Sequence, residues 1–123
     1  MSNLPQHLQL NEKEAIESVS ELLFQTLGDN LAEVYLFGSK ARGDFHADSD
    51  IDLLVIVERL NHESRWEIRA TAADCSLKFD VLFNTHILDK KRWNQLAKTQ
   101  DTLWREVQQD GISLQDFATQ LIN

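Results

Sequence analysis

The chain has few residues that cross-link or interrupt a polypeptide: its 123 residues include one cysteine and one proline. Cys75 cannot form an internal disulfide, so we interpret it as a small buried side chain in a protein of the reducing cytoplasm. The proline, Pro5, lies near the start, and no Pro-rich or low-complexity linker follows it. The length and the missing linker predict a single domain over residues 1–123.

Long apolar runs are also missing. No run approaches the ~20 residues that are needed to cross a membrane. The opening sequence, MSNLPQHLQL, has neither the basic part nor the long apolar part of a secretory signal. We therefore predict a cytoplasmic protein with no membrane partner.

Basic residues are scarce, because 12 Lys and Arg stand against 20 Asp and Glu, for a net charge of −8. Affinity for nucleic acids comes largely from Lys and Arg that neutralise phosphates, so we expect no direct nucleic-acid partner. A compact anion screened by a metal, such as Mg·ATP, is not excluded by this charge. An acidic protein also suits a basic protein partner.

Apolar residues recur at helical spacing in three stretches. The first helix is predicted to begin at an N-cap, Asn11, and to end at Gly28. The second runs from residue 61 or 62 to about 75. The third covers 89–109, either as one helix or as two that break near 99–101. We expect the tryptophans of these helices to be core residues: Trp66, Trp93 and Trp104.

Short apolar or alternating stretches predict the strands. They cover residues 32–37, 50–57 and 77–83, with a short edge strand at 112–114. The sequence IDLLVIV marks the second strand as central, because it is apolar on both faces. These elements predict an α/β fold: a small mixed β-sheet of three to four strands, with helices mainly on one face.

The most informative segment is residues 36–57, LFGSKARGDFHADSDIDLLVIV. Gly38 has no Cβ, so a turn at Gly38-Ser39 lets backbone amides approach a phosphate, and one helical turn over 39–43 adds unpaired amides. A loop over 44–48 follows. Asp50 and Asp52 then leave one face of a strand, roughly 6.6 Å apart at Cα. Two carboxylates so placed can hold Mg²⁺ on substrate phosphates, which indicates nucleotidyl transfer.

This pattern resembles the Gly-Ser and Asp-x-Asp signature of the DNA-polymerase-beta-like nucleotidyltransferases. The short chain and the Ala-Arg-Gly-Asp sequence resemble the minimal nucleotidyltransferases, many of which are MntA-type antitoxins paired with a HEPN-domain toxin. The resemblance implies a nucleotidyltransferase fold, ATP as substrate, Mg²⁺ as two ions and a HEPN toxin as protein partner. It also implies that AMP moves to a tyrosine of that toxin.

The resemblance assigns roles to single residues. Asp50 and Asp52 are expected to be catalytic and to bind the metal, and Gly38 and Ser39 to bind the nucleotide. The family often takes a third catalytic, metal-binding carboxylate from the next strand, and only Asp80 is acidic in the strand predicted over 77–83. The alternative for Asp80 is a solvent-facing aspartate.

Two basic residues follow the Gly-Ser pair. Arg42 lies three positions after Ser39, on the same face of a helical turn, and is expected to contact the triphosphate. Lys40 points elsewhere on that turn and is expected to be solvated.

Three functions remain open from the sequence. The first is an enzyme that adds AMP to a toxin and thereby neutralises it. The second is an antitoxin that masks the toxin by binding, without catalysis. The third, which we expect to be the weaker alternative, is a nucleotidyltransferase that acts on a small molecule, because residues 1–123 predict no appended helical domain that would form a pocket for one.

Overall fold

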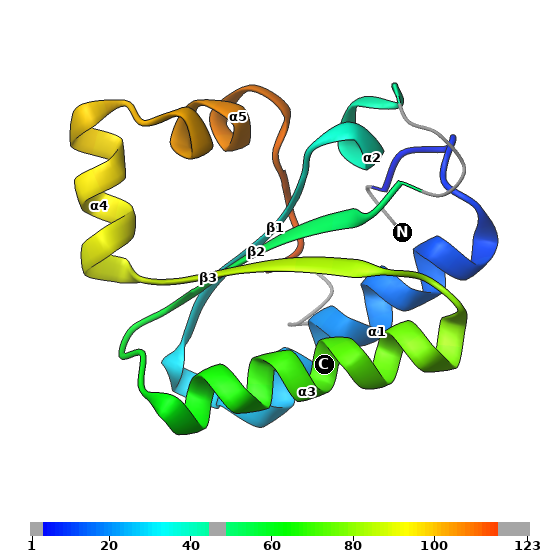
Figure 1. The fold of residues 1–123 in the computed structure, drawn as a ribbon, viewed down its shortest axis with the longest axis horizontal. Helices are drawn as coiled ribbons and strands as arrows, with labels where there is room; N and C mark the ends of the chain where they lie inside the picture. Colours follow the sequence, from blue (N-terminus) through cyan, green and yellow to red (C-terminus); the bar gives the residue numbers. More distant parts are fainter. Residues whose placement is uncertain (1–3, 45–48, 116–123) are drawn as a thin grey trace.

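The computed structural model describes residues 4–44 and 49–115. Its centre is a four-stranded mixed sheet with the strand order β3-β2-β1-β4 (Figure 1). Strand β2 pairs antiparallel with β1 and parallel with β3, and β4 pairs antiparallel with β1. The strands are β1 (Leu31–Phe37), β2 (Ile51–Val57), β3 (Phe83–Asp89) and β4 (Ile112–Ser113). The mixed α/β sheet is thus confirmed, with the IDLLVIV strand inside it.

Helices lie on both faces of this sheet, and the two longest share one face (Figure 1). These are α1 (Leu10–Leu27) and α3 (His62–Phe79), and α3 makes the crossover between the parallel strands β2 and β3. The shorter α4 (Lys90–Thr99) and α5 (Thr102–Asp110) pack against the other face. A 3₁₀ turn (Gly28–Asn30) precedes β1, and a single turn, α2 (Ser39–Arg42), follows it.

The central strand has two buried faces. Leu53 and Val55 belong to the core between the sheet and the long helices, together with Ile16 and Ile68. Leu54 and Ile56, which alternate with them along β2, pack against Trp93 of α4 on the other face of the sheet. Successive side chains of a strand point to opposite faces of the sheet, and those of β2 are apolar on both faces, so β2 can lie between two helical layers.

The prediction of a strand over residues 77–83 was wrong. Residues 77–79 form the last turn of α3, Asp80 caps that helix in a left-handed conformation (φ 55°), and the third strand begins only at Phe83. Alternation of apolar residues cannot separate the end of a helix from a short strand. Because Leu77 is on the outer side of α3, it is 85% exposed.

Two helix boundaries also differ from expectation. Helix α1 starts one residue before Asn11, and the Gln9 backbone N–H donates to Glu12 Oε1 (2.8 Å) as the cap. Asn11 instead donates its side-chain amide to the Phe79 carbonyl (2.9 Å). The alternative of a break near 99–101 is confirmed, since Gln100 (φ 53°) separates α4 from α5.

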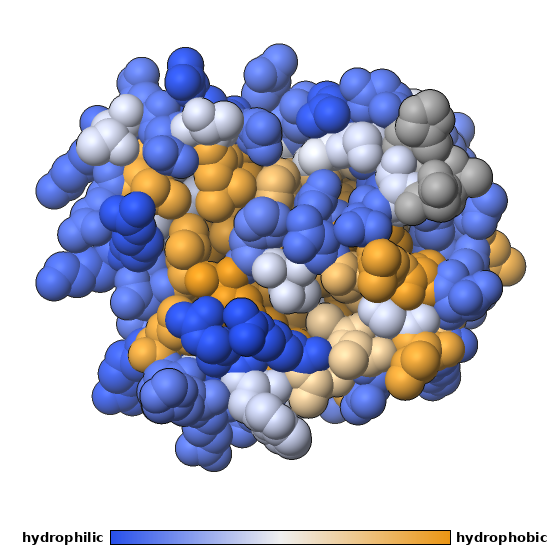
Figure 2. All heavy atoms as spheres, viewed as in Figure 1, coloured by the Kyte–Doolittle hydropathy of each residue, from blue (hydrophilic) through white to orange (hydrophobic). Residues whose placement is uncertain are grey.

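The tryptophans were predicted correctly only in part. Trp93 is buried and Trp104 is half-buried, but Trp66 is 71% exposed on the outer side of α3. Beside that helix, Leu77 and Leu82 line an apolar groove of about 480 Å³ between α3 and the start of β3. Figure 2 shows hydrophobic side chains among hydrophilic ones on the face of the molecule that carries α3 and β3. Within residues 4–44 and 49–115, no helix combines the length and the apolar character that a membrane span requires.

Candidate active site

The Gly-Ser pair forms a sharp turn between β1 and α2. Gly38 has φ 77° and ψ −159°, a conformation that costs a residue with a Cβ on the order of 1–3 kcal/mol. The Gly38 carbonyl accepts the amides of Ala41 and Arg42, and the Gly43 amide donates to the Ser39 carbonyl. The predicted helical turn is therefore confirmed, and it begins at Ser39.

Asp52 lies directly beside this turn. It is the second residue of β2 and pairs with Phe37 in the antiparallel register, so its carboxylate lies next to Gly38. A Cβ added to Gly38 would overlap Asp52 Oδ2. The glycine is thus required both by the backbone conformation and by the carboxylate. Asp50 lies just before β2 and is half-buried.

The opposite flank of Asp52 is formed by β3. Asn84 pairs with Asp52 in the parallel register and donates its side-chain amide to Asp52 Oδ1 (3.0 Å). His86 Nε2 lies 4.0 Å from the same oxygen, and the His86 ring packs edge-on against Phe37, with 5.1 Å between ring centroids. The sequence reasoning missed both residues because it placed the third strand too early. The alternation of Asn84 and His86 was the available signal for a polar strand face.

Asp80 does not lie beside Asp52. It lines a pocket of about 270 Å³ together with Ser49, Ile51 and the start of α1, including Glu12. Ile51 belongs to the core under the long helices, whereas Asp52, the next residue of an extended strand, points to the opposite face. The described residues include no group of three or more His, Cys, Asp or Glu that could hold a metal ion. A metal role for Asp80 stays a prediction, and its premise, a position on the third strand, was wrong.

Arg42 is at the end of α2 and is partly exposed. Its Nε donates to Asp44 Oδ1 (3.1 Å), and its Nη1 lies 3.7 Å from Asp110 Oδ2 at the end of α5. This hydrogen bond, which the Asp44 carboxylate accepts, raises the pKa of the Arg42 guanidinium above its ordinary value, so Arg42 keeps its charge. A contact between Arg42 and a phosphate stays a prediction.

The prediction that Lys40 is solvated was wrong, because the residue is buried. Its side chain is 1% exposed, and its Nζ lies 2.5 Å from Glu12 Oε2 on α1. The turn that carries Ser39 is therefore tied to the first turn of α1 by a buried ion pair. Nothing in the spacing of the sequence indicates that these two residues meet. The expected loop over 44–48, with the exception of Asp44, lies outside the described residues.

The sequence of the chain is similar to those of known proteins. The family model described as "Polymerase beta, Nucleotidyltransferase" matches residues 17–116. The "Putative protein adenylyltransferase MJ0141" of Methanocaldococcus jannaschii is 37% identical over 81 residues, which are 63% of this chain and 82% of the relative.

Two solved structures are similar in fold as well as sequence. One is a toxin–antitoxin with AMP-PNP, with 28% identity and a TM-score of 0.52 over 86% of this chain and 83% of the other. The second is a mutant of the toxin–antitoxin MntA–HpeT, in which glutamate replaces two aspartates two positions apart. It has 26% identity and a TM-score of 0.51 over 92% of this chain and 85% of the other.

The family model covers β1, the Gly38 turn, Asp52 and β3, which together build the site described above. The similarity thus extends over most of the chain and not only over a short motif. The chain belongs to the polymerase beta nucleotidyltransferase family, as the Gly-Ser and Asp-x-Asp pattern implied.

Proposed function

We propose that this chain transfers AMP from Mg·ATP to a hydroxyl group, that of a tyrosine, on a partner HEPN toxin, and that this modification neutralises the toxin. One observation carries the proposal: the Asp52 carboxylate lies against the Gly38 turn, with no side chain between them. A phosphate bound by the turn would therefore meet a carboxylate-held cation at the same place.

Similar proteins support the choice of nucleotide and acceptor. A relative carries the name of a protein adenylyltransferase, and a solved neighbour is a toxin–antitoxin with AMP-PNP, an analogue of ATP. In the MntA–HpeT mutant, the two replaced aspartates have the same spacing as Asp50 and Asp52. The HEPN class of the partner follows the resemblance of the sequence.

The residues at the site fit a magnesium ion. Asp50 and Asp52 offer carboxylate oxygens, which Mg²⁺ prefers, and the Asp52 side chain is 23% exposed and thus accessible. The space beside Asp52 Oδ2, which a Cβ at position 38 would fill, is left open by glycine. When bound, the ion supplies charge screening and polarises the phosphate oxygens. Phosphate and water oxygens would supply its other ligands, since Mg²⁺ is usually shared with them.

The chemistry that we propose requires little covalent work from the protein. The acceptor oxygen attacks the α-phosphorus of ATP and forms a new P–O bond. The bond between this phosphorus and the oxygen that bridges to the β-phosphorus breaks, pyrophosphate leaves with the electron pair, and the hydroxyl proton passes to water. The amides at Gly38 and Ser39 bind phosphate oxygens, and Asn84 holds Asp52 in place. Arg42 can turn from Asp44 toward a phosphate, because exposed ion pairs are weak.

The test uses the chain together with a HEPN-type toxin. Co-expression with the wild-type chain should add AMP-sized mass increments to the partner, located on tyrosine by peptide mass spectrometry. The double variant Asp50→Ala/Asp52→Ala should add none and should fail to restore growth. Asp74→Ala, a change on the outer side of α3, is the matched control and should behave as the wild type.

The two other functions give different results. If the double variant restores growth fully and the partner keeps its mass, the chain neutralises by binding alone. If AMP appears only on a small molecule, the acceptor is not a protein. Either result would overturn the proposed reaction while leaving the family membership intact.

A further inference from the structure

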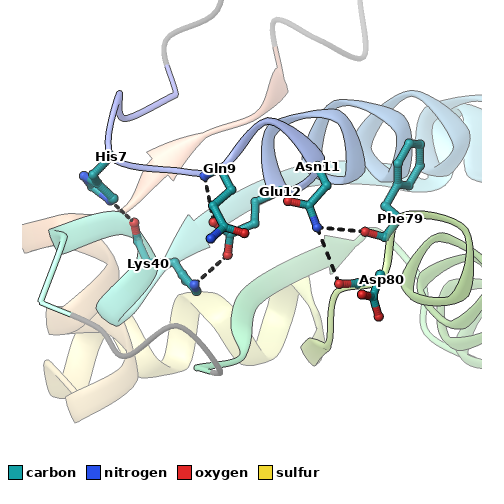
Figure 3. A network of polar contacts seen from close by, with 7 residues as sticks. All are labelled: His7, Gln9, Asn11, Glu12, Lys40, Phe79 and Asp80. Carbon is teal, nitrogen blue, oxygen red and sulfur yellow. Dashed lines mark hydrogen bonds and ion pairs between the residues drawn. The ribbon is translucent and has the colours of Figure 1, made fainter.

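A buried ion pair joins two elements that are far apart in the sequence. Lys40 Nζ, on α2, and Glu12 Oε2, in the first turn of α1, are 2.5 Å apart, and their side chains are 1% and 7% exposed. Figure 3 shows Glu12 between Lys40 and the backbone of Gln9. Removing two charges from water is costly, so such a pair persists only where the geometry satisfies both groups.

The residues before α1 extend this contact. His7 Nε2 donates to the Lys40 carbonyl (2.6 Å), and the Gln9 amide donates to Glu12 Oε1 (2.8 Å) (Figure 3). A Cβ at Gly43 would lie 3.1 Å from the His7 ring, so this ring packs closely on the end of α2. The His7 side chain therefore contacts α2 at the Lys40 carbonyl and also packs on Gly43, the residue that ends the helix.

Helix α2 needs such support. It has four residues, Ser39–Arg42, and a helix of one turn is not stable by its own hydrogen bonds. Its first residue, Ser39, belongs to the turn that lies beside Asp52. Any shift of α2 would move the amides of this turn relative to the carboxylate, and a misplacement of about 1 Å can cost on the order of 10²-fold in rate.

We propose that Glu12, Lys40 and His7 are positioning residues, which hold α2 and the Gly38-Ser39 turn in the geometry that binds the nucleotide. None of the three needs to touch the substrate. The proposal rests on the proposed function in one respect, namely that the turn binds the phosphates of ATP. An apolar pair at these two positions could fill the same space, but it would not hold α2 in a single orientation as the ion pair does.

The first experiment measures the affinity for Mg·ATP by calorimetry. Lys40→Met should weaken binding roughly tenfold, the lower end of what loss of a supporting contact costs. Val19→Ala is the matched control, because Val19 is a fully buried core residue of α1 itself, about two helical turns beyond Glu12. It should lower the melting temperature and leave the affinity unchanged. Equal losses of affinity in both variants would overturn the proposal.

A double variant separates positioning from stability. Lys40→Met alone leaves the Glu12 carboxylate buried without its partner and should lower the melting temperature. Glu12→Gln/Lys40→Met removes both charges and keeps a side-chain oxygen for the Gln9 amide, so the melting temperature should recover while binding of Mg·ATP stays weak. If affinity recovers together with stability, the pair serves the fold alone and the proposal fails. Because the double variant restores folding, the test does not depend on how well Lys40→Met folds.

A measurement without nucleotide tests the same contacts. In the wild type the amides of Arg42 and Gly43 donate within α2, and amide hydrogen exchange reports how often these bonds open. Lys40→Met and His7→Ala should speed this exchange, and Val19→Ala should not. Unchanged exchange in both would overturn the proposal.

The outcomes distinguish this proposal from the proposed function. If the wild-type chain does not bind Mg·ATP, both proposals fail. If it binds Mg·ATP and Lys40→Met binds equally well, only the positioning role fails. If Lys40→Met loses affinity, exchanges faster at α2, and does not regain affinity when Glu12→Gln is added, the positioning role is supported.

Discussion

The two flanks of Asp52 are built in different ways. On the β1 side, the carboxylate meets Gly38, where the absence of a side chain leaves space. On the β3 side, it meets Asn84, whose amide donates a hydrogen bond to Oδ1. The Gly38 flank therefore contributes open space beside the carboxylate, whereas the Asn84 flank contributes a hydrogen bond to it.

This difference also decides how each flank could be recognised. Gly38 follows β1, which pairs with β2 directly, so the motif that contains both lies within residues 36–57. Asn84 reaches Asp52 only after the chain has passed through α3 and entered a parallel strand. The first flank is a local pattern, whereas the second is a matter of register. Substitutions on each side test whether they contribute to the same chemistry.

The largest effect is expected from Asp52, which both flanks share. Asp52→Ala should lower transfer of AMP by on the order of 10³-fold, because the site loses a carboxylate and the developing charge loses its stabilisation. Circular dichroism should show an unchanged fold, since the side chain is partly exposed. Transfer at a rate near that of the wild type would contradict the assignment.

The glycine flank is tested by two alanine substitutions. Gly38→Ala should cost on the order of 10²-fold in transfer, because its Cβ displaces Asp52 Oδ2. Gly28→Ala is the matched control: Gly28 also has a positive φ, but nothing lies within 4 Å of its added Cβ. Both should lose about 1–3 kcal/mol of stability from backbone strain, and only Gly38→Ala should lose activity. Equal activities would show that space beside Asp52 is unimportant.

The asparagine flank should give a smaller effect. Asn84→Ala removes the hydrogen bond to Asp52 Oδ1 and should reduce transfer by about 10- to 100-fold, as for other residues that orient a metal ligand. The neighbouring Thr85 points to the other face of the strand and lines the apolar groove. Thr85→Ala should leave transfer unchanged. A comparable loss in both variants would indicate a general effect of β3.

The smallest effect concerns Tyr35, the only tyrosine, which lies on the same sheet face as Phe37. Burial, and then the hydrogen bond to Glu33, raise its pKa to about 12. In the unfolded chain, the tyrosine side chain ionises with its ordinary pKa of about 10. The stability from this protonated phenol is therefore complete below about pH 10 and is lost as the pH rises toward 12. Absorbance titration measures the shift.

The same titration sharpens the comparison of the two flanks. If Asn84 acts locally on Asp52, Asn84→Ala should titrate at Tyr35 as the wild type does. A lowered pKa of Tyr35 in that variant would show that the whole face of the sheet has moved.

The sequence by itself determined the local parts of this protein. Apolar content on both faces predicts a central β2, and Gly38-Ser39 followed by Asp50 and Asp52 predicts the turn and the carboxylates. These signals are readable because helix and strand periods, and the need for glycine at a strained turn, act over a few residues.

Only the tertiary structure decided which distant residues complete the site. Asp80 was expected beside Asp52, but the parallel register places Asn84 there. Lys40 was expected in solvent, but packing of α2 on α1 buries it against Glu12. Register and burial depend on how whole elements pack, and a difference of a few residues at a helix end changes both. The chemistry of the motif is therefore local, whereas its support comes from the fold.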